Sequence, residues 1–198
     1  MKWRTRTLAI IAAGCSVFLV QDASRAAGAS GQPIQRAGAQ EVVAPAGREF
    51  ARLREAAVGG DAQAQYDLAV ALDCGRGVRK DRTSSLDWLR KAAEQGHVQA
   101  QGALGWRYMA GSGVRRDDSA AYEWLRLAAE RGNTAAQNNL GVLYAQGRGV
   151  AADPVEAAKW FRLAAEKGAQ DAQRNLDALL AGRSREARKG TEPPLPRT

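Results

Sequence analysis

The sequence predicts an all-α protein that stacks three full helix pairs of 36 residues each, with a half-repeat cap at each end. A tryptophan, a closing glycine and a leucine all recur at this spacing without an insertion. They are Trp88, Trp124 and Trp160; Gly60, Gly96, Gly132 and Gly168; and Leu68, Leu104, Leu140 and Leu176. A fixed period of about 20–50 residues indicates a repeat architecture, because stacking buries apolar faces that one unit cannot bury alone.

The first helix of each repeat is expected over residues 62–73, 98–109 and 134–145. Leucine, a small residue and a later aromatic follow one another there at helical spacing, as in Leu140, Gly141 and Tyr144, so that one face is apolar. A Gly-x-Gly-Val element then ends the helix, since glycine tolerates the positive φ of a helix C-terminus. Its copies are Gly75-Arg76-Gly77-Val78, Gly111-Ser112-Gly113-Val114 and Gly147-Arg148-Gly149-Val150.

The second helix of each repeat is expected over residues 82–94, 118–130 and 154–166. An aspartate precedes each one (Asp81, Asp117 and Asp153), where its carboxylate can accept hydrogen bonds from the first-turn amides. The third copy adds Pro154 at the first helical position and Glu156 at the capping-box position. We expect the tryptophan of each second helix to be a core residue that bridges the two helices.

Both ends of the stack are predicted to be half repeats. Residues 48–60 match a lone second helix in which Arg52 replaces the tryptophan. Residues 169–183 match a lone first helix in which Asp177 replaces the small residue and Arg183 replaces the first loop glycine. Polar substitutions of this kind are typical of a capping helix, because one of its faces meets water.

These repeats resemble the Sel1-like repeat family, which is related to the tetratricopeptide repeat. Leucine, paired loop glycines, valine, aspartate, tryptophan, a double alanine and the closing glycine recur in register across residues 60–181. The resemblance implies a right-handed α-solenoid whose concave face is lined largely by the first helices. It divides the chain into the repeats 61–96, 97–132 and 133–168. It also implies that the chain is a scaffold or adaptor that binds a protein or peptide. We expect the chain itself to be a monomer.

Residues 1–26 are predicted to be a signal peptide. Lys2, Arg4 and Arg6 precede an apolar stretch over residues 8–20. Two small-x-small cleavage sites follow, Ser24-Arg25-Ala26 and Ala27-Gly28-Ala29, and we favour cleavage after Ala26. An alternative is a lipoprotein signal or an uncleaved anchor, because Ala12-Ala13-Gly14 precedes Cys15 as in a lipoprotein box. We therefore expect a periplasmic or secreted protein of a Gram-negative bacterium, or one that is lipid-anchored through Cys15.

Two further segments lack helical periodicity. Residues 27–47 are rich in Ala, Gly, Gln and Pro and are predicted to be a flexible linker. Residues 184–198 are charged, contain three prolines and are predicted to be a disordered tail.

The formal charge of +8 does not indicate a nucleic-acid-binding domain. Residues 61–181 hold sixteen basic and fifteen acidic side chains, so the repeats are almost neutral and the basic excess lies near the two ends. Nucleic-acid binding requires a basic folded face. We expect no nucleic-acid partner, and membrane contact only through an uncleaved N-terminal segment or a lipidated Cys15.

No motif predicts catalysis, a cofactor or a metal. The chain lacks Walker, dinucleotide-binding and Ser-x-x-Lys motifs, and its single histidine, His97, is expected to be a solvated turn residue. A cysteine-rich branch of Sel1-like proteins resembles penicillin-binding proteins and β-lactamases in activity, but only Cys74 lies in a repeat here. We predict a non-enzymatic protein; the alternatives are a cell-wall enzyme and an anchored structural lipoprotein.

A binding surface is predicted from first-helix positions that differ between repeats. Trp106 and Arg107 are the main pair, because tryptophan and arginine are over-represented in interface hot spots. The full candidate set is Tyr66, Asp67, Trp106, Arg107, Asn138 and Asn139. The recurring glutamines Gln65, Gln101, Gln137 and Gln173 are expected either to bond between adjacent repeats or to contact the partner.

Overall fold

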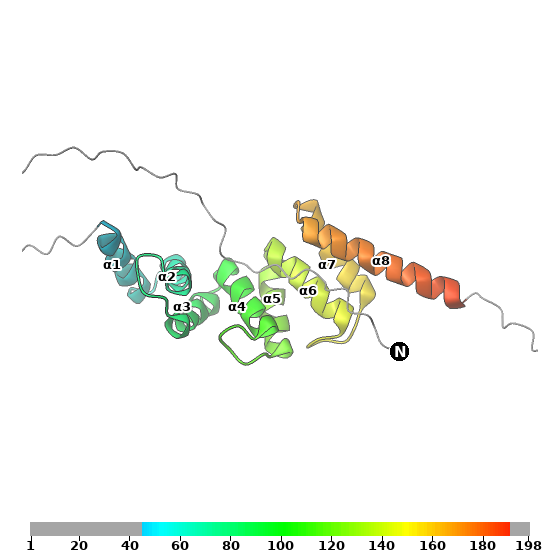
Figure 1. Ribbon diagram of the computed structural model, residues 1–198, viewed down its shortest axis with the longest axis horizontal. Helices are drawn as coiled ribbons and strands as arrows, with labels where there is room; N and C mark the ends of the chain where they lie inside the picture. Colours follow the sequence, from blue (N-terminus) through cyan, green and yellow to red (C-terminus); the bar gives the residue numbers. More distant parts are fainter. Residues whose placement is uncertain (1–44, 191–198) are drawn as a thin grey trace, which may run out of the picture.

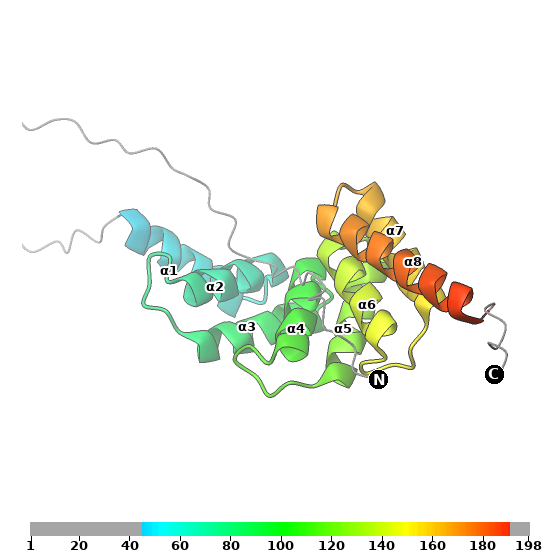
Figure 2. The same cartoon turned by 45° about the vertical axis from the view of Figure 1, so that its right-hand side comes forward.

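The computed structural model describes residues 45–190, with side-chain surroundings for residues 49–182. This part of the chain forms eight helices and no strands. They are α1 (Pro45–Val58), α2 (Ala62–Cys74), α3 (Arg82–Glu94), α4 (Val98–Ala110), α5 (Asp118–Glu130), α6 (Thr134–Gln146), α7 (Pro154–Glu166) and α8 (Gln170–Gly190). Figures 1 and 2 show an elongated row of packed helices, which confirms the predicted helical-repeat solenoid.

The helices of the three full repeats begin and end where the sequence signals lie. We call α2, α4, α6 and α8 the A helices, and α1, α3, α5 and α7 the B helices. The A helices of the full repeats run one residue beyond their predicted ends and stop at glycines with positive φ: 73° at Gly75, 70° at Gly111 and 65° at Gly147. Each predicted aspartate cap accepts hydrogen bonds from two first-turn amides. Local capping chemistry therefore fixes the helix lengths.

The two terminal helices are longer than predicted. α1 begins at Pro45, inside the range predicted as a linker, and proline is favourable in the first turn of a helix. α8 continues to Gly190, so residues 184–190 are helical where a disordered tail was predicted. α8 continues because Arg183 stands at the position where a glycine ends each of the other A helices. The predicted signal peptide, with Cys15, lies outside the described residues.

The A helices of repeats 2 and 3 and the C-terminal A helix contact one another from repeat to repeat. α4 packs directly on α6, and α6 packs on α8, whereas α3, α5 and α7 each pack on A helices rather than on one another. In residues 45–190, every helix falls short of the combined length and apolarity that a bilayer crossing requires.

The centre of the core differs from the prediction. The predicted core tryptophans, including Trp88 and Trp124, are only partly buried. The residue that follows each one occupies the centre: Leu89 is 2% exposed, and Leu125 and Phe161 are 0% exposed. One step along a helix turns a side chain by about 100°, so the neighbour faces the A helices while the indole covers the edge.

The recurring glutamines tie each repeat to the one before it. The Nε2 atoms of Gln65, Gln101 and Gln137 donate to the carbonyl oxygens of Ala57, Ala93 and Ala129 at 3.1, 3.2 and 3.1 Å, and all three bonds are buried. This confirms inter-repeat bonding at three positions. At the exposed end of the stack, Gln173 instead donates to Asp177 on its own helix.

Candidate functional site

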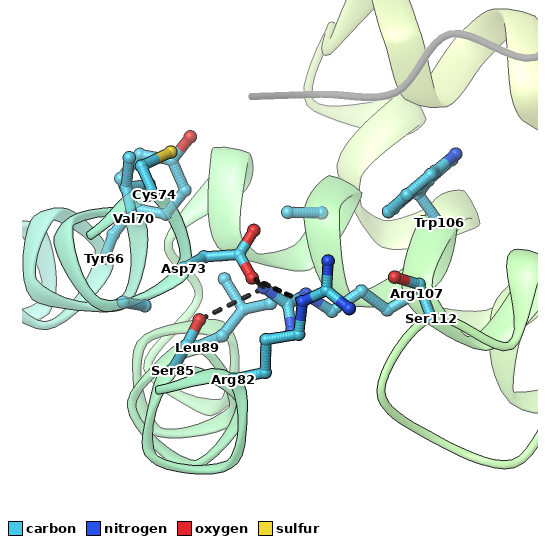
Figure 3. Close-up of a pocket in the computed structure, with 12 residues that line it drawn as sticks. Tyr66, Val70, Asp73, Cys74, Arg82, Ser85, Leu89, Trp106, Arg107 and Ser112 are labelled. Atoms are coloured by element: carbon cyan, nitrogen blue, oxygen red, sulfur yellow. Dashed lines mark hydrogen bonds and ion pairs between the residues drawn. The ribbon is translucent and has the colours of Figure 1, made fainter. Parts of the chain in front are cut away.

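A pocket of about 170 Å³ opens between α2, α3 and α4. It lies at the first junction, which we define as the contact between repeat 1 (α2 and α3) and repeat 2 (α4 and α5). We call it the first-junction pocket (Figure 3). Its polar and aromatic lining, together with Val70, consists of Tyr66, Asp73, Arg82, Ser85, Trp106, Arg107 and Ser112.

Charged groups occupy the centre of this pocket. Arg107 is 7% exposed, and its Nη2 lies 3.2 Å from Asp73 Oδ1 and donates to Ser85 Oγ at 3.1 Å. Arg82 Nε lies 3.9 Å from the same Asp73 oxygen, and Figure 3 shows both guanidinium groups beside this carboxylate. One carboxylate therefore serves two arginines, which leaves the group with a charge of +1.

An aromatic pair separates the two A helices of the first junction. The rings of Tyr66 and His97 stack with their centroids 4.8 Å apart. His97 is the N-cap of α4: its Nδ1 accepts from the Ala100 amide at 3.2 Å, and its Nε2 lies 2.9 Å from Gln63 Oε1. His97 lies in the turn between α3 and α4, as predicted, and it is partly buried there rather than fully solvated. Burial lowers the pKa of His97, which favours the neutral ring that the cap requires.

The second junction, between repeat 2 and repeat 3 (α6 and α7), is filled at the equivalent place. Arg148 donates two hydrogen bonds to Asp118, from Nη2 to Oδ1 at 2.7 Å and from Nε to Oδ2 at 3.1 Å. The same Nη2 donates to the Met109 carbonyl oxygen at 3.0 Å. Hydrogen bonds from Arg116 and Arg148 hold the pKa of Asp118 well below its usual range.

The 36-residue register explains why one junction is open and the other closed. Ser112 and Arg82 of the first junction correspond to Arg148 and Asp118 of the second, so the ion pair that fills the second is missing from the first. The polar pair Asp73 and Arg107 likewise corresponds to the buried apolar pair Met109 and Leu143.

The spacing between neighbouring A helices also differs between the first and the second junction. Tyr66 corresponds to Gly102, and a Cβ atom on Gly102 would lie 3.2 Å from Asn133 Nδ2. The missing side chain lets the second junction close, and α4 packs on α6 there. The Tyr66–His97 stack fills this place in the first junction, where α2 and α4 make few direct contacts.

The structure sorts the predicted binding residues into two groups. Tyr66, Trp106 and Arg107 line the first-junction pocket together, and Asp67 is exposed on α2 nearby. The assignment of Asn138 and Asn139 to a binding surface was wrong, because they are 0% and 1% exposed. Asn138 Oδ1 instead accepts from the Asn175 amide nitrogen at 2.9 Å and joins two A helices.

Sequence reasoning missed Asp73, Arg82 and Ser85. A signal was present, because polar Asp73 and Ser85 stand where the next repeat has Met109 and Ala121. Helix packing places these residues next to the predicted Trp106 and Arg107. This proximity depends on how the helices are arranged in space, so variation along a single helix does not reveal it.

The polar groups of the pocket are two guanidinium groups, one carboxylate and the hydroxyl groups of Tyr66, Ser85 and Ser112. The Ser85 hydroxyl faces the Arg107 guanidinium, which offers only hydrogen-bond donors and cannot act as its general base. Within residues 49–182, His, Cys, Asp and Glu side chains form no group of three or more that could hold a metal ion. The arrangement offers positive charge, hydroxyl groups and apolar surface to a ligand.

Known proteins resemble this chain in both sequence and fold. The profile of the Sel1 repeat matches residues 62–97, 98–133 and 134–168. The solved Sel1 repeat protein from Oxalobacter formigenes is 38% identical with a TM-score of 0.62, over 66% of this chain and 98% of that one. A protective antigen of uropathogenic Escherichia coli strains that displays an SLR fold is 44% identical with a TM-score of 0.61. This match covers 64% of the present chain but only 27% of the antigen.

A more distant structure shares the fold alone. The cysteine rich protein B of Helicobacter pylori is 22% identical with a TM-score of 0.53, over 70% of this chain and 100% of that one. No curated protein matches the chain.

Proposed function

This chain belongs to the Sel1 repeat family, and we propose that it is a scaffold that binds a segment of a partner protein at the first-junction pocket. Proteins of this family generally mediate contacts between proteins. The observation that carries the proposal is the open first junction, which holds a pocket where the second junction is filled by an ion pair.

The size and lining of the pocket support a peptide ligand. Its volume of about 170 Å³ is below the range of about 300–1,000 Å³ that is usual for small-molecule and cofactor sites. Tyr66, Val70 and Trp106 supply aromatic and apolar surface beside Arg107. Tyrosine, tryptophan and arginine are the residues that most often dominate binding energy at protein interfaces.

Peptide display on the full chain tests this proposal. Peptides selected from a random library are assayed by calorimetry against the wild type, Trp106→Ala and Trp160→Ala. Truncation of a hot-spot residue costs roughly 2 kcal/mol, so Trp106→Ala is expected to weaken binding about thirtyfold. Trp160 is a partly buried tryptophan away from the pocket, and its variant is the matched control. Equal affinities of the two variants would place the binding site elsewhere.

We further propose that the protein is exported and acts in the envelope of a Gram-negative bacterium. The proposal rests on the basic and apolar pattern of residues 1–26. Cell fractionation of the full chain and of a variant that lacks residues 1–26 tests it: only the full chain should leave the cytoplasm. The mass of the exported form distinguishes cleavage after Ala26 from lipidation at Cys15, since Cys15→Ala abolishes only the lipid-bearing form.

A further inference from the structure

We propose that the first-junction pocket recognises a carboxylate on the bound segment, carried by an aspartate or glutamate side chain and held by Arg82 and Arg107. This inference rests on the proposed function and names the chemistry of its partner.

The second junction shows what fills the equivalent place when the chain fills it itself. There, an acidic side chain, Asp118, is held by two hydrogen bonds from the guanidinium of Arg148. In the first junction Asp118 is replaced by Arg82, and Arg148 by the much shorter Ser112. Both members of that ion pair are therefore changed, and the first junction holds two arginines, Arg82 and Arg107, against the single carboxylate of Asp73. The place is suited to a second carboxylate from another molecule.

The charge balance supports the same ligand. Asp73 is the carboxylate that faces both Arg82 and Arg107, and it leaves one positive charge uncompensated. The Arg82 side chain is 64% exposed and has donors available to a ligand. Guanidinium groups bind carboxylates in a planar, two-point geometry, and such charge-assisted bonds are stronger than neutral ones.

Arg107 is already held in place for this role. Its bonds to Ser85 and Asp73 fix the guanidinium at the base of the pocket, so little side-chain freedom is lost when a ligand binds. The neighbouring apolar surface of Tyr66, Val70 and Trp106 suits an apolar residue next to the acidic one. An acidic residue flanked by apolar residues is therefore the expected recognition unit.

Three short peptides test the ligand chemistry on the full chain. The probes are acetyl-Leu-Glu-Leu-amide, its neutral counterpart acetyl-Leu-Gln-Leu-amide, and acetyl-Leu-Gln-Leu with a free terminal carboxylate. Affinities are measured by NMR titration at low and high salt. We expect the glutamate peptide to bind at least about tenfold more tightly than the neutral one, and salt to weaken this preference.

A variant that refills the pocket supplies the decisive comparison. Arg82→Asp combined with Ser112→Arg transplants the Asp118 and Arg148 pair of the second junction into the first. The introduced carboxylate should then occupy the site. The preference of the protein for the glutamate peptide over the neutral peptide should fall at least tenfold, while the melting temperature is maintained. Val155→Ala, which changes an exposed residue on α7, is the control and should bind as the wild type does.

The outcomes separate this inference from the proposed function. Equal affinity for all three peptides, no binding at millimolar concentration, or full binding by the refilled variant would overturn the carboxylate assignment. Binding of the free-terminus peptide alone would overturn the side-chain source. If display-selected peptides still depend on Trp106 but show no acidic preference, the inference fails and the proposed function stands.

Discussion

The two junctions between the full repeats are built on one plan and finished with different chemistry. The second is sealed by the Asp118–Arg148 ion pair and by buried Met109 and Leu143. The first has polar groups at the same register positions, a tyrosine in place of a glycine on the A helix, and a pocket. The repeat consensus therefore builds the solenoid, while departures from it at a few positions on α2, α3 and α4 and in the following loop create a pocket.

The largest expected effect comes from moving the chemistry of the first junction into the second. Leu143→Arg places at a fully buried position the arginine that the first junction has at 107. Without an acidic partner the buried charge should cost about 3–5 kcal/mol of the free energy of unfolding, measured by urea denaturation. Met109→Asp in the same chain should restore part of this loss, and a cost below about 1 kcal/mol would contradict the comparison.

The next effect separates the core from its edge within α5. Leu125 is 0% exposed in the cluster that spans repeats 2 and 3, whereas Trp124 is partly buried and packs against the cluster of repeats 1 and 2. We expect Leu125→Ala to cost about 3 kcal/mol through cavity formation, and Trp124→Ala to cost less. Thermal unfolding of both variants checks this order. A larger loss of stability for Trp124→Ala would show that the indole lies at the centre of the core.

Closing the first junction should stabilise the protein. Asp73→Met with Arg107→Leu copies the apolar pair Met109 and Leu143, and replacing a largely buried ion pair by apolar residues stabilises by up to about 1–4 kcal/mol. We expect about 1 kcal/mol, since Asp73 is partly exposed, together with loss of the acidic-peptide preference. Destabilisation by both urea and heat would show that the polar pair is structural.

The ion pair of the second junction should respond to acid. Arg148→Ala removes the hydrogen bonds to Asp118 and to the Met109 carbonyl oxygen, as well as one to Gln146, and should cost about 1–2 kcal/mol at neutral pH, because the pair is partly exposed. The pKa of Asp118 lies below its ordinary value of 3.8, so its contribution is present above that pH and is lost as the pH falls further. Stability measured below about pH 4 should decline less steeply in Arg148→Ala.

The smallest effect is expected from the first junction under mild acid. The pKa of His97 is lowered from 6.5 by burial, which outweighs the opposing charge of Asp67, with Arg131 adding to the decrease. The stability that neutral His97 contributes is therefore present above that pH and is lost as the pH falls through the folded-state pKa. His97→Asn copies the Asn133 cap and should remove this dependence on pH. An unchanged pH profile in this variant would exclude His97 as its source.

The fold could be predicted because its signals are local and repeated. The glycines at 75, 111 and 147 and the aspartates at 81, 117 and 153 act within one turn of the helix that they end or begin. The end of α8 was missed because the expectation rested on the prolines further along and on the charge of the segment. Arg183 simply lacks the left-handed conformation that glycine gives to the other A helices.

The site could be predicted only in part. Tyr66, Trp106 and Arg107 were identified because they vary between repeats, but Asn138 and Asn139 vary equally and are buried. Variation marks departure from the consensus, and burial then depends on how closely the neighbouring A helix packs. That spacing is set jointly by pairs of residues from different repeats, which a one-dimensional comparison does not bring together.

The most direct test of the account is an NMR titration of the indole N–H signals with acetyl-Leu-Glu-Leu-amide. Trp106 lines the first-junction pocket, whereas Trp160 packs at the filled end of the stack. We predict a saturable shift of the Trp106 signal, an unchanged Trp160 signal, and no Trp106 shift in the Arg82→Asp/Ser112→Arg variant. A shift of Trp160 without one of Trp106, or an equal Trp106 shift in the refilled variant, would contradict the claim that the open junction is the binding site.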